Sequence, residues 1–197
     1  MSYGYDEIGN LTLKSDLGSA PYVYDAFHGH PHAVAIAGGT SFTYDAVGNQ
    51  RSRSGTAVTY TPFDLPKTFT PPASAAVTLD YDGDQQRIRK SVAGGDVTVY
   101  LGDLYERVTH AGGTVEHRYY VHTAERLAAV VTRGGSAAGT LYVHADNLGS
   151  IDVLTKEDGS VVERRNELSY CDISSLICLK ICDITSTVQP LPIILYL

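Results

Sequence analysis

The sequence predicts an all-β fold built from antiparallel β-hairpin repeats. The first observation is a spacing of about 20 residues between tyrosines, which is typical of stacked supersecondary units. The second is a short Tyr-Asp motif that recurs at several of these tyrosines. The third is a composition of 19 glycines and 14 tyrosines in 197 residues, without tryptophan, which favours turns and strands. The periodic tyrosines are Tyr5, Tyr24, Tyr44, Tyr60, Tyr81, Tyr100, Tyr120 and Tyr142.

The Tyr-Asp motif has the order expected of a strand followed by a tight turn. Its copies are Tyr5-Asp6 with Gly9-Asn10, Tyr24-Asp25 with Gly29, and Tyr44-Asp45 with Gly48-Asn49. Aspartate suits the first turn position, because its carboxylate accepts hydrogen bonds from the backbone N–H groups just ahead. A glycine three residues later can take the left-handed conformation that ends a bulged hairpin loop. Each unit is therefore predicted to be a strand, a turn and a strand.

Alternating apolar residues predict further strands at 97–101, 115–121 and 127–131. Paired glycines at 94–95, 112–113 and 134–135 separate them, and Asp158-Gly159 is a direct hairpin signal. Two units fit the pattern less well. Gln85 stands where the turn after Tyr81-Asp82 favours glycine, which weakens the expected hairpin. The prolines of residues 60–66 are expected to exclude that degenerate unit from a central position in the ladder.

Longer stretches of the chain resemble one family. The Tyr-Asp motif looks like the YD repeat of the rearrangement-hotspot (Rhs) and wall-associated proteins. Residues 81–90 and 99–106 are similar to the run that leads into the Rhs-associated core, and residues 118–131 continue it. The segment with His144, Asp146, Leu148, Gly149 and Ser150 matches the family's His-x-Asp-x-Leu-Gly-Ser signature. The resemblance covers about residues 3–165.

The resemblance implies a structural function. Long arrays of this kind wind a continuous β-sheet into a hollow shell that encloses a C-terminal toxin, or act as cell-surface adhesion modules that bind carbohydrate. The partners expected from the family are other repeats of a longer Rhs chain or an enclosed toxin domain, with carbohydrate as the alternative. Intact family members are secreted or at the cell surface. The family's self-cleavage uses aspartates of a downstream core motif, and no cleavage site can be carried over to this chain.

The sequence changes character after the repeat region. We expect residues 1–165 to be the YD/Rhs repeat region and residues 166–197 to be a divergent tail. The tail contains all three cysteines, Cys171, Cys178 and Cys182, whose spacing fits no zinc pattern with a fourth ligand. Two readings of the tail are open: a short variable C-terminal domain, or the remnant of a frameshift or truncation. We favour the second and expect the tail to pack badly or to be disordered.

Charge and hydropathy limit the partners. Fifteen basic and 22 acidic residues give a net charge of −7, so no electrostatic footprint for nucleic acid is expected. The small basic groups, at residues 51–53 and 87–90, are expected to be solvated strand faces. No signal peptide is expected at the start. The uncharged run at 185–197 has 13 residues, which is shorter than the roughly 20 that a membrane span needs.

No catalytic, cofactor or metal site is predicted. Asp80, Asp82 and Asp84 have the spacing of a calcium loop, but Gln85 stands where that loop needs glycine. His28, His30 and His32 could offer imidazoles to a metal, although Gly29 and Pro31 favour a simple turn. His144 and Asp146 could orient a general base, but no nucleophile is identifiable. We therefore expect the chain not to be an enzyme.

Overall fold

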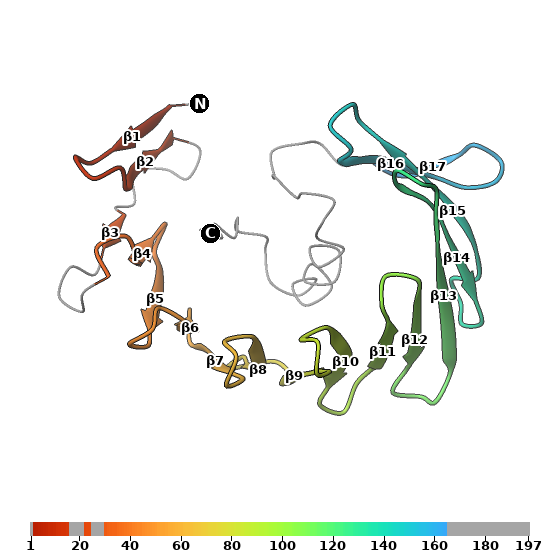
Figure 1. Cartoon of the computed structure of the whole chain (residues 1–197), viewed down its shortest axis with the longest axis horizontal. Helices are drawn as coiled ribbons and strands as arrows, with labels where there is room; N and C mark the ends of the chain where they lie inside the picture. Colours follow the sequence, from red (N-terminus) through yellow and green to blue (C-terminus); the bar gives the residue numbers. More distant parts are fainter. Residues whose placement is uncertain (1, 16–21, 25–29, 165–197) are drawn as a thin grey trace. The chain divides into compact units, whose positions relative to one another are not determined.

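The computed structural model describes residues 2–15, 22–24 and 30–164 of the chain. In this part of the chain every named element is a β-strand and there is no α-helix (Figure 1). The prediction of an all-β fold is confirmed. The sequence predictions that involve Asp25, His28, Gly29 and the three cysteines concern residues outside the described part of the chain.

The strands divide between two compact units, residues 1–97 and 98–197. The strands that begin in the first unit are β1 (Tyr3–Tyr5), β2 (Leu11–Lys14), β3 (Val23–Tyr24), β4 (Val34–Ala37), β5 (Thr40–Tyr44), β6 (Gln50–Arg53), β7 (Thr56–Tyr60), β8 (Pro66–Thr70), β9 (Val77–Tyr81), β10 (Arg87–Val92) and β11 (Val97–Leu101). The second unit continues with β12 (Tyr105–Thr109), β13 (Val115–His122), β14 (Leu127–Arg133), β15 (Gly139–Ala145), β16 (Ile151–Thr155) and β17 (Val161–Arg164).

The strands follow one another in space as they do in sequence. β1 and β2 form a two-stranded sheet, and β3 to β17 form a fifteen-stranded antiparallel sheet in unbroken order. Within each sheet, strands that follow one another in sequence therefore pair with each other, as in a chain of hairpins. The strands expected at 97–101, 115–121 and 127–131 are β11, β13 and β14.

In the first unit, the buried apolar side chains lie on one face of the sheet and a series of hydroxyl groups lies on the other. Val58, Val77 and Leu79 are buried on the first of these faces. On the opposite face, hydroxyl groups bond across neighbouring strands: Thr43 Oγ1 to Ser52 Oγ at 2.7 Å and Thr59 Oγ1 to Thr68 Oγ1 at 2.6 Å. This two-sided pattern follows from the alternation of side chains along a strand.

The second unit has an apolar core with buried charged side chains beside it. Tyr100, Val108 and Leu127 are buried. Glu106 and Glu116 are only 3% exposed each, which is unusual for a charged side chain.

Two expectations about weak units were wrong. Gln85 itself takes the left-handed conformation, with φ of 63°, so its turn closes without glycine. Pro66 lies in β8, between β7 and β9, where its Cα pairs with Tyr60. It is tolerated there because it is the first residue of the strand, a position at which a missing N–H donor breaks no central ladder bond.

Candidate functional site: the joints between repeats

The aspartate of the motif holds its own turn closed. The Asp6 N–H donates to the Asn10 carbonyl at 2.9 Å, and the Gly9 N–H donates to the Asp6 carbonyl at 3.1 Å. One carboxylate oxygen of Asp6 accepts from the Ile8 and Asn10 N–H groups at 3.0 and 2.8 Å. Burial would raise the pKa of Asp6, but these hydrogen bonds outweigh it and lower that pKa.

The same five-residue turn recurs along both units. At Asp45, Asp82 and Asp146, the carboxylate accepts from the N–H groups two and four residues ahead, at 2.8–3.1 Å. In the degenerate unit, Thr61 takes the place of aspartate, and its hydroxyl accepts from the Leu65 N–H at 3.1 Å. In this turn a hydroxyl therefore replaces the carboxylate.

The fourth turn residue takes the left-handed conformation in each of these copies. Gly9, Gly48 and Gly149 have φ of 88°, 96° and 91°. Gln85 and Asp64 fill the same position with φ of 63° and 62°. A residue with a Cβ is strained in this region, which is why glycine is the usual choice.

The tyrosine of the motif ties its unit to the preceding one. In four units its hydroxyl donates to the carbonyl of a residue that closely follows the previous turn. The bonds run from Tyr24 to Leu11 at 2.8 Å, from Tyr44 to Val34 at 3.0 Å, from Tyr60 to Gln50 at 2.9 Å and from Tyr81 to Pro66 at 2.7 Å. Burial raises the pKa of Tyr44, Tyr60 and Tyr81, so these phenols stay protonated and able to donate.

The asparagine of the motif ties its unit to the following one. Asn10, which is buried, donates from Nδ2 to the Pro31 carbonyl at 3.0 Å, and its Oδ1 lies 2.8 Å from His32 Nδ1. Asn49 donates from Nδ2 to Asp64 at 2.9 Å, in the turn of the next unit. Tyrosine therefore bonds backward and asparagine forward, and the two side chains join successive turns. We call these bonds the repeat joints.

The joints are not made at every tyrosine. Tyr5, the first of the series, is 63% exposed and makes no such bond within the described residues. Tyr142 is also exposed. Tyr120 lies in a different environment, where burial and a hydrogen bond to Glu106 raise its pKa.

The signature-like residues between His144 and Ser150 make separate local contacts and do not form one cluster. Asp146 closes its turn by accepting from the Leu148 and Ser150 N–H groups, and Leu148 is exposed. His144 Nε2 lies 2.9 Å from Thr155 Oγ1 on the neighbouring strand. The structure does not bring His144 and Asp146 together as a hydrogen-bonded pair, so this segment has the geometry of a turn.

A buried ionic group in the second unit was missed in the sequence. Arg118 Nε donates to Glu116 at 2.6 Å, and its guanidinium lies 3.7 Å from Glu106. Burial alone would lower the pKa of Arg118, but the two carboxylates raise it. Strand alternation was the available signal, because Glu116, Arg118 and Tyr120 are spaced by two. Their partner Glu106 lies directly opposite Arg118 in the ladder.

The aspartates with calcium-loop spacing serve other contacts. Asp82 serves its own turn, and Asp80 pairs with Arg89 at 2.7 Å. Within residues 2–15, 22–24 and 30–164, no group of three or more histidine, cysteine, aspartate or glutamate side chains is placed to hold a metal ion. In the same residues, no helix has the length and apolar character to cross a membrane.

The fold is similar to part of a solved toxin structure. No protein-family model and no curated protein matches this chain. The chain is similar to one in the crystal structure of TcdB2-TccC3-TEV, with a TM-score of 0.58 and 15% sequence identity. The match covers 84% of this chain and 9% of that one, so this chain spans a small part of the matched chain's length. At this identity the match shows a shared fold, which agrees with the β-repeat fold that the sequence predicts.

Proposed function

We propose that this chain is a structural segment of a β-sheet wall in a longer Rhs/YD-repeat protein. The observation that carries the proposal is the set of repeat joints, made backward by tyrosine and forward by asparagine. The side chains that define the motif are used to connect one turn to the next, by Tyr60 to Gln50 backward and Asn49 to Asp64 forward. Residues used in this way stiffen an array of repeats.

The wall would enclose a C-terminal toxin domain, as the family resemblance implies. Two observations support this finer proposal. The sheet runs through fifteen strands in sequence order, which is how a single chain extends a wall. A similar fold forms a small part, 9%, of the matched chain in the structure of TcdB2-TccC3-TEV.

The experiment is limited proteolysis of the protein expressed from its full reading frame, followed by electron microscopy. A wall that encloses its C-terminal region should protect that region from protease, and the particles should be hollow. The triple variant Y44F/Y60F/Y81F removes three backward joints and should shorten the protection. The matched control is Y5F, which removes a hydroxyl from an exposed tyrosine outside the joints.

If the C-terminal region is digested equally fast with and without the repeat region, the enclosing function is wrong. If the region is protected but the triple variant protects it as long as Y5F does, the repeat joints are not what holds the wall together.

A further inference from the structure

The sheet of the second unit has two faces of opposite charge character. One face of β12 and β13 carries Glu106 and Glu116 with Arg118 between them. Because side chains alternate, the residues between these point to the other face. That face, which we call the basic face, carries the side chains Tyr105, Arg107, His117, Tyr119, Val121, Arg133, Tyr142 and His144.

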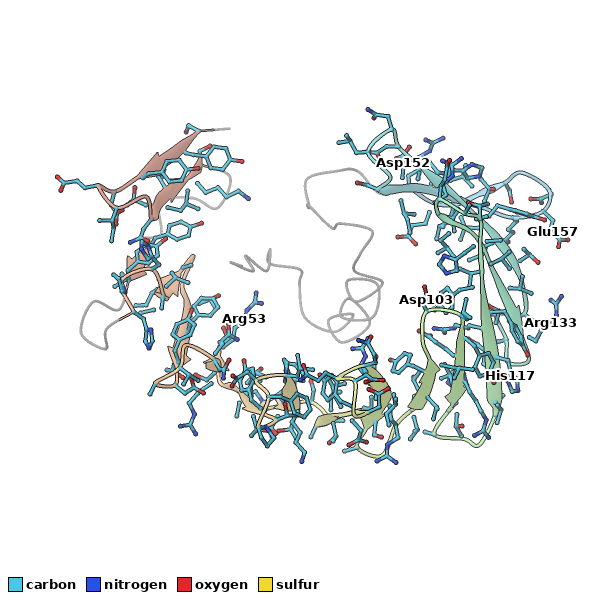
Figure 2. All side chains as sticks on the ribbon, in the orientation of Figure 1. Arg53, Asp103, His117, Arg133, Asp152 and Glu157 are labelled. Carbon is cyan, nitrogen blue, oxygen red and sulfur yellow. The ribbon has the colours of Figure 1, made fainter. Side chains whose placement is uncertain are left out.

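Three basic side chains form a row across the basic face. Arg107 pairs with His117, and His117 pairs with Arg133 on the next strand. Neighbouring strands lie about 4.8 Å apart, so the three groups stand side by side. Figure 2 shows the Arg133 side chain reaching outward from the ribbon of β14.

The row has no acidic counterpart on its own face. From β12 to β15 the residues that alternate onto the basic face include no aspartate or glutamate. Within the described residues, Arg107 has no ion pair, and Arg133 donates only to the neighbouring Thr132 carbonyl at 3.4 Å. His117 Nδ1 lies 2.6 Å from the Tyr105 hydroxyl. The two arginines of this row stand out in a chain whose net charge is −7.

Exposed apolar and aromatic side chains adjoin this row. Tyr119, Val121 and Tyr142 are each more than 40% exposed. Leu101 of β11 is 68% exposed and alternates away from the buried Tyr100. Tyr105 and Tyr119 are in ring contact, with centroids 5.2 Å apart. The partner that complements this face must be both anionic and able to take up apolar side chains.

We propose that the basic face of the second unit docks on the surface of an anionic lipid bilayer. Anionic headgroups attract arginines near the membrane surface, and tyrosine is enriched at the level of the headgroups. Apolar side chains such as Val121 and Leu101 gain free energy by entering the boundary of the acyl chains. An acidic glycan would satisfy the arginines but would leave the aliphatic side chains in water. This proposal depends on one face of the second unit and not on the wall function.

The test is cosedimentation of the full chain with lipid vesicles. One set contains phosphatidylcholine alone, and the other has phosphatidylserine in place of part of it. Binding is expected only to the second set and should weaken with salt. The variant R107Q/R133Q should lower the partition coefficient roughly fivefold for each arginine, and V121S should lower it further.

The control is R51Q/R126Q, which changes the net charge by the same amount at two exposed arginines outside the basic face. The control should bind as the unmodified chain does, and all variants should keep the same melting temperature. Equal binding to both vesicle sets, or an equal loss in the control, would overturn the proposal. Binding to immobilised heparin without binding to vesicles would assign the face to an anionic glycan and would overturn it too.

Discussion

The left-handed turn glycines show how a single residue fixes the repeat. Gly48 has φ of 96° and no other atom within 4 Å of the place where a Cβ would stand. A substitution there meets open space, so any loss of stability arises from backbone strain alone. Gly83 also lies in open space, in another turn of the same type, but without positive φ.

These two glycines make a matched pair for a stability test. Gly48→Ala should lower the free energy of unfolding by about 1 kcal/mol, because alanine is strained at positive φ. Gly83→Ala should be neutral or slightly stabilising, since it reduces the entropy of the unfolded chain. Chemical denaturation of both variants measures the difference. Equal denaturation midpoints for the two variants would show that a side chain at position 48 causes no backbone strain.

The hydroxyl of Tyr60 provides a test of the backward joints. Tyr60→Phe removes the bond to the Gln50 carbonyl and should cost about 1 kcal/mol of unfolding free energy. Tyr5→Phe makes the same chemical change at an exposed side chain and should have no effect. Thermal melts of the two variants decide the point, and a cost at Tyr5 as large as that at Tyr60 would contradict it.

The same tyrosines make stability depend on alkaline pH. Burial raises the pKa of Tyr44, Tyr60 and Tyr81 above the ordinary 10.0, so in the folded protein they ionise later than in the unfolded chain. Their contribution is complete below pH 10.0 and is lost as the pH rises through the higher folded values. In an alkaline titration followed by phenolate absorbance, one part of the signal should therefore appear only when the protein unfolds. If all 14 tyrosines titrate together near their ordinary pKa, the tyrosines of the repeat joints are not buried as described.

Within an element, the side chains that alternate on β13 build the buried ionic group. Glu106 and Glu116 share Arg118, so each carboxylate depends on the same guanidinium. Removal of one partner from a buried ionic group leaves uncompensated charge, which costs more than the loss of an exposed pair.

Arg118→Met should therefore destabilise the protein by about 3–5 kcal/mol, because two buried carboxylates lose their cation. Arg89→Met is the control, since the Arg89–Asp80 pair is largely solvated and should cost about 1 kcal/mol at most. Denaturation midpoints compare the two. Similar costs for both variants would mean that Glu106 and Glu116 are not held as ions by Arg118.

The elements themselves could be predicted better than the contacts between them. Turn chemistry at Asp6 and Asp45 is local, so the sequence predicts it directly. The bond from Tyr60 to Gln50 depends on the register of two strands, which one sequence does not specify. Gln85 and Pro66 were misjudged for a related reason: neighbouring strands hold the turn and the strand start against local preference.

At the scale of the whole molecule, the feature that matters for association is the edge strand of the fifteen-stranded sheet. Among the described residues, the fifteen-stranded sheet ends at β17, all four residues of which are exposed, including Val161 and Val162. An edge strand presents backbone N–H and C=O groups that can pair with another chain. Exposed valines add apolar surface to that edge, which favours association.

We therefore expect the isolated chain to associate in solution through this edge. Size-exclusion chromatography with light scattering should show oligomers that grow with protein concentration. Val162→Lys should shift the distribution toward monomer, because a charge on an edge strand opposes pairing. Val47→Lys is the control, since Val47 is an exposed valine in the Asp45 turn, away from the edge. A monomer at all concentrations, or an equal effect of the two lysines, would show that β17 does not act as an open edge.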